Sequence, residues 1–204
     1  MISAILLAAG ESKRMGRSKL LLKWGQCTII EKSVDTLLAS KIDELIVVLG
    51  YQGQAILRRL GSRSLKPVIN PQYGMGMSTS IRRGLGQVSS KSEAILIGLA
   101  DQPFIETDLI NHLIDIYRQN PHGIVLPSYK GERGHPVILN RFRYQGEMEN
   151  LTGDIGCRPI LKRYPEDILE VEVESEGVVA DIDSWEEYRA TSILGKGFQG
   201  NDAK

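Results

Sequence analysis

Residues 7–19 of the chain have the sequence LAAGESKRMGRSK. They follow an apolar run over residues 2–7, which is typical of a buried strand, so the stretch is expected to form the turn that leaves this strand. Gly10 and Gly16 allow backbone conformations that are closed to other residues, and several N–H groups can then point into one concavity. The turn carries four basic residues and one acid: Lys13, Arg14, Arg17 and Lys19 against Glu11. A concavity of amides surrounded by positive charge is suited to a polyphosphate.

The spacing of this turn excludes two common phosphate-binding loops. A P-loop has four residues between its glycines, followed by Lys and then Ser or Thr. Here five residues separate Gly10 from Gly16, and Lys19 is followed by Leu20. The dinucleotide fingerprint G-x-G-x-x-G is also absent. A basic, solvated turn without any ligand is the alternative interpretation.

Length and composition limit the class of protein. A chain of 204 residues is expected to form one domain over residues 1–190, followed by a polar, glycine-rich tail over residues 191–204 without a catalytic part. The 25 basic and 25 acidic residues balance, so no overall field favours nucleic acid or membranes as partners. No apolar run approaches the ~20 residues of a membrane helix. Cys27 and Cys157 are expected to be ordinary reduced thiols of a cytoplasmic protein.

Strand and helix patterns alternate along most of the chain. A capping box is expected where Thr28 and Glu31 begin a helix. The predicted buried strands are residues 4–8, 45–49, 67–69, 94–99, 124–126 and 137–139, and the predicted helices include residues 29–38, 52–60 and 78–88. This order predicts an α/β fold with a mainly parallel sheet and helices on both faces. Residues 169–173 and 178–182 are expected to form a small added β-ribbon before a helix that Ser184 and Glu187 cap.

Two aspartates are candidate metal ligands. Asp101 follows the apolar run 94–99 and precedes Pro103, so its carboxylate is expected at the carboxyl end of a strand, facing the same crevice as the basic turn. Such a carboxylate could hold Mg²⁺, which prefers oxygen ligands, or could simply cap the turn. Alternation along a strand would place Asp181 and Asp183 on one side, and Asp183 is favoured as the second ligand over a purely structural cap.

The turn resembles a known family. Residues 7–19 match without a break the pattern L-A-[AG]-G-x-S-x-R-M-G-x-x-K of nucleotidyltransferases with a Rossmann-like core, and most resemble the molybdenum-cofactor group. The resemblance implies a three-layer Rossmann-like nucleotidyltransferase fold. It also implies catalytic roles for Arg14 and Lys19 at the triphosphate and for Asp101 as a metal ligand, with Asp183 as a second one. The nucleotide-binding residues that it implies are Leu7, Ala8, Ala9, Gly10, Arg14, Lys19 and Ser80.

The base is expected to be cytosine. Relatives that use GTP generally have L-A-G-G at this turn, whereas those that use CTP have L-A-A-G, as here. The methyl group of Ala9 would narrow the base slot, but one methyl changes selectivity by only about 1–3 kcal/mol. The segment Ser80–Leu85 resembles the helix start that several cytidylyltransferases place near the cytosine. Alternatively, Ser78 is no more than the N-cap of this helix.

The second half of the chain carries the expected acceptor site. The segments G-H-P at residues 134–136 and G-D-x-G-x-R at residues 153–158 resemble those of molybdopterin cytidylyltransferases. The resemblance implies that His135, Asp154 and Arg158 bind the pterin or its phosphate. Alternatively, His135 only orients its loop and Arg158 only pairs with Asp154.

Together these features identify the chain as similar to the molybdenum cofactor cytidylyltransferase family. The resemblance implies transfer of CMP from CTP to Mo-loaded molybdopterin with Mg²⁺, and delivery of the product to an apo-molybdoenzyme of the xanthine dehydrogenase type. Two other classes stay open. One is a guanylyltransferase or another nucleoside triphosphate transferase, and the other is a non-catalytic chaperone for the cofactor.

Overall fold

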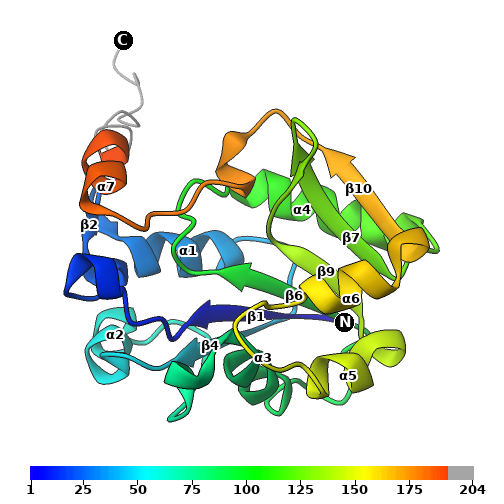
Figure 1. The fold of residues 1–204 in the computed structure, drawn as a ribbon, viewed down its shortest axis with the longest axis horizontal. Helices are drawn as coiled ribbons and strands as arrows, with labels where there is room; N and C mark the ends of the chain where they lie inside the picture. The colour runs from blue at the N-terminus through cyan, green and yellow to red at the C-terminus, as the bar shows by residue number, and fades with distance from the viewer. Residues whose placement is uncertain (193–204) are drawn as a thin grey trace.

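The computed structural model describes residues 1–192, and its centre is one mixed sheet of mainly parallel strands (Figure 1). The strands run in the order β10-β7-β9-β6-β1-β4-β5, with the short β8 paired to β7. Only β8 and β9 pair antiparallel to their neighbours in this sheet. The strands are β1 (Ile2–Ala8), β4 (Glu44–Leu49), β5 (Lys66–Ile69), β6 (Ala94–Leu99), β7 (Ile124–Tyr129), β8 (Glu132–Arg133), β9 (Val137–Asn140) and β10 (Ile168–Glu172). A separate two-stranded sheet joins β2 (Lys23–Trp24) to β3 (Cys27–Thr28).

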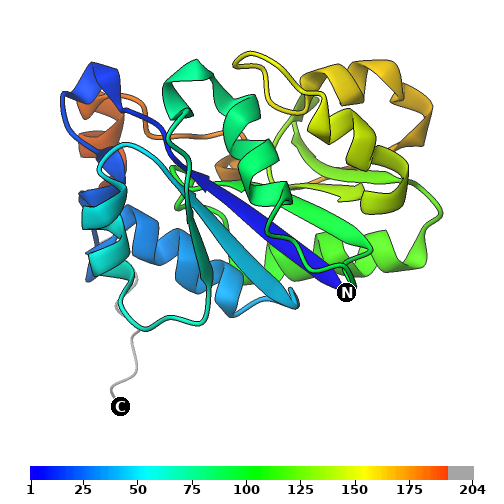
Figure 2. The same ribbon diagram turned by 90° about the horizontal axis from the view of Figure 1, so that it is seen from below.

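Helices cover both faces of this sheet, as Figures 1 and 2 show from two sides. Along β1, Ala4, Leu6 and Ala8 pack into one core with helices α1, α2 and α4, whereas Ile5 packs into a second core with α3, α5 and α6. The helices are α1 (Ile29–Leu38), α2 (Gly53–Leu60), α3 (Met77–Leu85), α4 (Thr107–Gln119), α5 (Arg141–Glu149), α6 (Arg158–Arg163) and α7 (Trp185–Ser192). The predicted three-layer α/β fold, with a mainly parallel sheet covered on both faces, is confirmed.

The predicted β-ribbon over residues 169–173 and 178–182 is wrong. Strand β10 pairs in parallel with β7 instead, with Ile168 opposite Ile124. Residues 176–178 form a 3₁₀ turn and residues 179–183 form no strand. The apolar spacing of residues 178–182 resembles that of a strand for a different reason. Val178 and Ile182 are both fully buried, although neither belongs to a strand. The β additions that do occur are the short pair of β8 with β7 and the separate pair of β2 with β3.

Both predicted capping boxes are present. At α7, the Glu187 carboxylate accepts a hydrogen bond from Ser184 N, while Glu187 N donates to Ser184 Oγ. At α1, the Glu31 carboxylate accepts hydrogen bonds from Thr28 N at 2.9 Å and from Thr28 Oγ1 at 2.7 Å.

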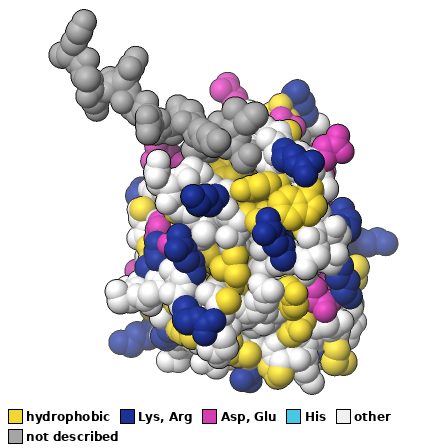
Figure 3. Space-filling view, turned by 90° about the vertical axis from the view of Figure 1, so that its left-hand side faces the viewer, with side chains coloured by type: hydrophobic (Ala, Val, Ile, Leu, Met, Phe, Trp, Pro, Cys, Tyr) yellow, Lys and Arg dark blue, Asp and Glu magenta, His cyan; other side chains and the backbone are white. Residues whose placement is uncertain are grey.

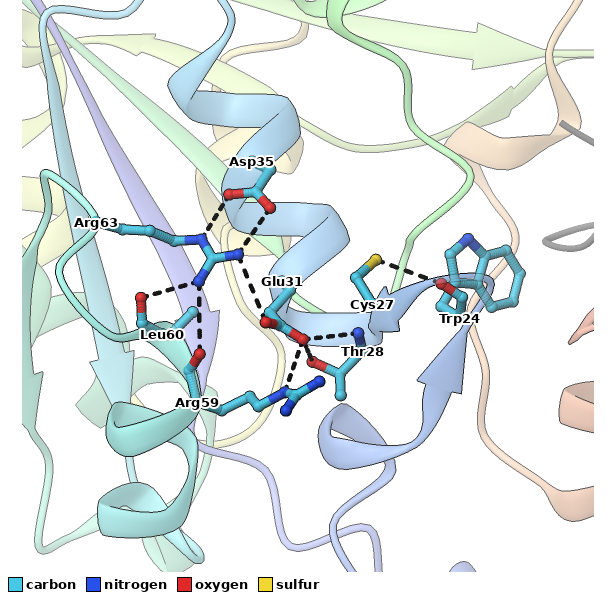
Figure 4. A network of polar contacts seen from close by, with 8 residues as sticks. All are labelled: Trp24, Cys27, Thr28, Glu31, Asp35, Arg59, Leu60 and Arg63. Atoms are coloured by element: carbon cyan, nitrogen blue, oxygen red, sulfur yellow. Dashed lines mark hydrogen bonds and ion pairs between the residues drawn. The ribbon is translucent and has the colours of Figure 1, made fainter. Parts of the chain in front are cut away.

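Glu31 also ties α1 to α2 (Figure 4). Its buried carboxylate accepts a hydrogen bond from Arg59 Nε at 2.8 Å and lies 3.5 Å from an Arg63 nitrogen. Arg63 forms a forked pair with Asp35 as well. Burial acts to raise the pKa of Glu31, but the hydrogen bonds from Thr28 and Arg59 outweigh it, so the pKa lies below its usual value. The first helix and the second are therefore joined by one ionised carboxylate.

Within residues 1–192, no helix combines the length and the apolar character needed to cross a bilayer. The predicted polar tail begins at residue 191, and its residues 193–204 lie outside the part of the chain that the structure describes.

Replacing Glu31 should destabilise the fold. We expect Glu31→Ala to lower the free energy of unfolding by about 1–2 kcal/mol at neutral pH, because a helix cap and the partner of two arginines are lost. The pKa of Glu31 is lowered in the folded protein, so its contribution is present above the usual glutamate pKa and disappears as the pH falls below it. Urea unfolding at several pH values measures both effects.

Glu166 provides a matched control, since it is exposed. Glu166→Ala should change the free energy of unfolding by less than about 0.5 kcal/mol. Equal stability of the two variants would contradict the role given to Glu31.

Candidate active site

The basic turn and Asp101 leave adjacent parallel strands, β1 and β6, at the same edge of the sheet. The turn begins at the end of β1 and includes a 3₁₀ segment, η1 (Lys13–Met15). Gly16 takes the left-handed conformation, with φ of 69°, as its flexibility suggested. Ser12 takes it too, with φ of 51°, and its Oγ accepts a hydrogen bond from Lys19 N at 3.1 Å. This hydrogen bond joins residues 12 and 19 and so brings the two ends of the turn together.

Lys19 is the central cation of the site. Its side chain is largely buried, and its ammonium lies 2.6 Å from Asp101 Oδ2 and 2.6 Å from Asp183 Oδ1. Arg14, which is mostly exposed, pairs with the other oxygen of Asp183. Burial acts to lower the pKa of Lys19, but the two carboxylates outweigh it and raise the pKa above its usual value. Lys19 and Asp183 are therefore both charged at neutral pH, since the same contacts lower the pKa of Asp183 against its burial.

A strap over residues 176–183 brings the last two aspartates to this edge. Val178 O accepts hydrogen bonds from His135 N at 2.9 Å and from Gln102 Nε2 at 3.5 Å. Further along, Ile182 N donates to Asp101 O at 3.2 Å. The strap is thus fixed to the turn after β6 and to the turn before β9. These hydrogen bonds explain how Asp181 and Asp183 meet Asp101, some eighty positions earlier in the chain.

Three carboxylates converge where the strap ends. One oxygen from each of Asp101, Asp181 and Asp183 lies within 4.8 Å of the others. The sequence favoured Asp101 and Asp183 as a pair, and the structure adds Asp181. Burial raises the pKa of Asp181, as do its neighbours Asp183 and Asp101. The predicted closeness of Asp181 and Asp183 holds, although no strand produces it.

This donor set fits a hard divalent cation such as Mg²⁺. Carboxylate oxygens are the ligands that such a cation prefers. The Lys19 ammonium, a positive charge in contact with both Asp101 and Asp183, already shows that the position stabilises a cation.

A hollow of about 340 Å³, here called the β1–β6 hollow, opens over the three carboxylates. Its lining residues are Leu7, Ala9, Gly10, Tyr73, Met77, Ser80, Leu99, Asp101, Asp154, Asp181 and Asp183. Four of the predicted nucleotide-binding residues therefore line it: Leu7, Ala9, Gly10 and Ser80. The side chain of Ala8 packs into the core instead, and Arg14 reaches the site through Asp183.

A second hollow of about 540 Å³, here called the α6 hollow, adjoins the first. Its lining residues are Met77, Leu99, Arg133, Gly134, His135, Val137, Asp154, Ile155, Gly156, Cys157, Arg158, Leu161, Lys162 and Asp181. The three predicted acceptor residues, His135, Asp154 and Arg158, all line it. Two hollows that share Met77, Leu99, Asp154 and Asp181 form one continuous cleft with two compartments.

The polar groups of the α6 hollow differ in charge. Burial lowers the pKa of His135, and Arg158 lowers it further against the opposing effect of Asp101, so its imidazole is neutral at physiological pH. Burial raises the pKa of the Cys157 thiol to about 12. Lys162 stands one helical turn after Arg158 on α6, and the sequence analysis missed it. The i, i+4 spacing of two basic residues on a helix was the signal that could have found it.

Asp154 joins the two compartments. Its Oδ1 accepts a hydrogen bond from Met77 N at 2.8 Å, and Gly153 O accepts one from Ser78 N at 3.2 Å. The start of α3 is therefore capped by a distant segment, and Gly76 has to be glycine, because a Cβ there would lie 2.6 Å from Gly153 O. Two alternatives from the sequence are wrong. Within residues 1–192, Arg158 forms no ion pair with Asp154, and Ser78 lies inside α3 rather than at its N-cap.

Ser80 lies on the first turns of α3, facing the β1–β6 hollow. Its buried Oγ accepts a hydrogen bond from Asn70 Nδ2 at 3.0 Å. The same amide also donates to Thr79 Oγ1 at 2.9 Å, so Asn70 orients both hydroxyls.

One face of the molecule carries many basic side chains. The face that carries η1, α2 and α7 shows mainly Lys and Arg among its charged side chains (Figure 3). A positive surface of this kind attracts anions.

Comparison with known proteins identifies the family. Residues 4–168 match the model of the MobA-like NTP transferase domain. The chain belongs to this family. It is a nucleotidyltransferase of the MobA-like type.

Full-length relatives carry different names. The chain is 28% identical to nicotine blue oxidoreductase of Paenarthrobacter nicotinovorans, over 91% of this chain and 94% of that protein. It is 29% identical to molybdenum cofactor cytidylyltransferase of Escherichia coli K12, over 92% and 93%. The structure of Rv0371c from Mycobacterium tuberculosis in complex with manganese superposes with a TM-score of 0.79 at 25% identity, over 93% of this chain and 96% of that one.

The close approach of Gly134 to the strap yields a prediction. A Cβ at residue 134 would lie 2.4 Å from Val178 O, a backbone atom that cannot move without the strap. We expect Gly134→Ala to lower the free energy of unfolding by about 1–3 kcal/mol, as overpacking does. Urea unfolding measures the change.

Gly146, inside α5, is the matched control, since a Cβ there would meet nothing within 4 Å. Gly146→Ala should leave stability unchanged or raise it by up to about 1 kcal/mol. If Gly134→Ala were as stable as the wild type, the strap would not be fixed at this point.

Proposed function

We propose that this protein transfers CMP from CTP to the terminal phosphate of Mo-loaded molybdopterin, producing molybdopterin cytosine dinucleotide and pyrophosphate. The observation that carries the proposal is the continuous cleft, whose two compartments share Asp181, a member of the carboxylate cluster. Such a cleft can hold two substrates with their reacting groups at the shared boundary. The E. coli relative named as a molybdenum cofactor cytidylyltransferase supports this choice of substrates.

The nucleotide would occupy the β1–β6 hollow. Its triphosphate would lie along the turn that leaves β1, where Lys19 and Arg14 can neutralise its charge. Asp101 and Asp183, with Asp181 beside them, would hold Mg²⁺. When bound, the metal supplies a positive charge that orients the phosphates and stabilises the charge of the leaving group.

The acceptor would occupy the α6 hollow. Its apolar lining, which includes Leu99, Val137 and Leu161, suits a flat ring system, and Arg158 offers a fork for a phosphate. His135 is neutral, so it does not repel the nearby Arg158. Its imidazole can donate one hydrogen bond to the acceptor and accept another from it.

The transfer itself is a displacement at phosphorus. A terminal oxygen of the acceptor phosphate forms a bond to the α-phosphorus of CTP, the bond from that phosphorus to the bridging oxygen breaks, and pyrophosphate leaves. The phosphate nucleophile is already ionised, so no side chain has to remove a proton. Catalysis then depends on alignment and charge neutralisation by Lys19, Arg14 and the cation that the carboxylates hold.

The proposed setting is the cytoplasm, and the proposed recipient is an apo-molybdoenzyme of the xanthine dehydrogenase type. Transfer from GTP, transfer to another acceptor and cofactor delivery without catalysis are the outcomes that the following test separates.

The direct test is release of pyrophosphate with CTP or GTP, on molybdopterin carrying molybdate, with and without Mg²⁺. We expect magnesium-dependent release with CTP and little with GTP. Asp101→Asn should reduce the rate at least about a hundredfold, because the cation loses a charged ligand. Asp108→Asn, on the exposed surface of α4, is the matched control and should keep wild-type activity.

A preference for GTP would leave the assignment of the site unchanged, but the product would then carry GMP instead of CMP. No release with either nucleotide would favour a different acceptor or a carrier that does not catalyse the transfer.

Ala9 should contribute to the choice of base, since it lines the β1–β6 hollow. We expect Ala9→Gly to improve the kcat/KM for GTP relative to CTP by roughly tenfold, the usual effect of one methyl group in a pocket. Competition between the two nucleotides measures the change. An unaltered ratio would mean that the base is selected elsewhere.

A further inference from the structure

Both side chains expected at the triphosphate already have partners in the protein alone. Lys19 contacts Asp101 and Asp183, and Arg14 contacts Asp183. These carboxylates are the proposed metal ligands. The side chains proposed to bind the nucleotide and those proposed to bind the metal therefore neutralise each other's charges.

The overlap involves two of the three clustered carboxylates. The Lys19 ammonium lies 2.6 Å from Asp101 Oδ2 and 2.6 Å from Asp183 Oδ1, and both aspartates belong to the cluster of three carboxylates. A divalent cation that binds both carboxylates has to share them with an adjacent positive charge or displace it. Sharing is unfavourable because the site is partly buried, where like charges repel more strongly than in water.

From this geometry we infer that Lys19 occupies the cation position of the nucleotide-free protein, and that the triphosphate and the metal bind as a coupled pair. The inference rests on the metal role proposed above for Asp101 and Asp183. The triphosphate draws Lys19 away from the two aspartates, and the metal takes its place. Without a triphosphate, the metal must displace the ammonium and binds weakly.

The local structure permits this exchange. The backbone N–H of Lys19 is held by Ser12 Oγ, so the residue stays at the edge of the β1–β6 hollow while its side chain changes partners. The lysine stem is long and flexible, and its ammonium can follow either set of oxygens. Arg14 can likewise exchange its contact with Asp183 for a contact with a phosphate.

The contact of Lys19 with the two aspartates also stabilises the carboxylate cluster. Three carboxylates held within 4.8 Å would repel one another, and Lys19 compensates that repulsion until the substrate arrives. Because coupling is reciprocal, CTP should strengthen metal binding by the same factor by which the metal strengthens CTP binding.

The test is the affinity for Mn²⁺, measured by the paramagnetic resonance signal of the free ion, with and without CTP and without any acceptor. We expect weak binding of Mn²⁺ to the wild type alone and much tighter binding with CTP. Lys19→Met should bind Mn²⁺ alone roughly tenfold or more tightly than the wild type, because no ammonium has to be displaced. The same variant should show a smaller effect of CTP on Mn²⁺ affinity.

Lys13→Met is the matched control, since this lysine of the same turn pairs with Glu11 and not with the cluster. It should leave the affinity for Mn²⁺ alone unchanged. Asp101→Asn should weaken Mn²⁺ binding in the wild type and in Lys19→Met alike. If Lys19→Met folds poorly, Lys19→Gln serves instead, and the rise in melting temperature on adding Mn²⁺ should be larger for that variant than for the wild type.

The failures are distinguishable. Should Lys19→Met bind Mn²⁺ no more tightly than the wild type while Asp101→Asn abolishes binding, the exchange is refuted and the metal site stands. Absence of Mn²⁺ binding in every protein, with CTP and without it, refutes the exchange together with the metal role.

Discussion

The contact of the Lys19 ammonium with Asp101 and Asp183 is the interaction on which the rest of the site depends. It joins the turn after β1, the turn after β6 and the strap over residues 176–183. Each segment is separately fixed: the first by Ser12, the second by strand β6, and the third by the hydrogen bonds of Val178 and Ile182. A buried or partly buried charge is tolerated only with partners of opposite sign, so the three segments hold one another in register.

The two compartments of the cleft come from different parts of the chain. Most residues that line the β1–β6 hollow lie between positions 7 and 101, in helix α3 and in segments at the edge of the sheet where β1 and β6 end, which is a usual place for ligand sites in such sheets. The α6 hollow is formed mostly by residues 133–162, which include the antiparallel β9 and the segment before α6. The shared residues lie between them, so chemistry at the boundary requires both halves.

Much of this arrangement could be predicted because local sequence determines it. Glycines and basic residues after a strand predicted the turn, and a carboxylate followed by Pro103 predicted the end of β6. The strap could not be predicted, because burial of Val178 and Ile182 produces the same apolar spacing as a strand, and only tertiary contacts distinguish the two. The capping of α3 by Asp154 was missed for a related reason: the sequence does not show which distant carboxylate satisfies a free N–H.

The docking of Gly153 and Asp154 against the start of α3 has a consequence for how this cleft can diversify. Substitutions in the stretch from Ile155 to Lys162 would reshape the α6 hollow while the β1–β6 hollow kept its geometry. Substitutions at Gly76 or Asp154 would disturb both compartments together. The α6 hollow can therefore take new shapes by changes in one short, contiguous segment, provided that Gly153 and Asp154, which precede it, keep their hydrogen bonds to the start of α3.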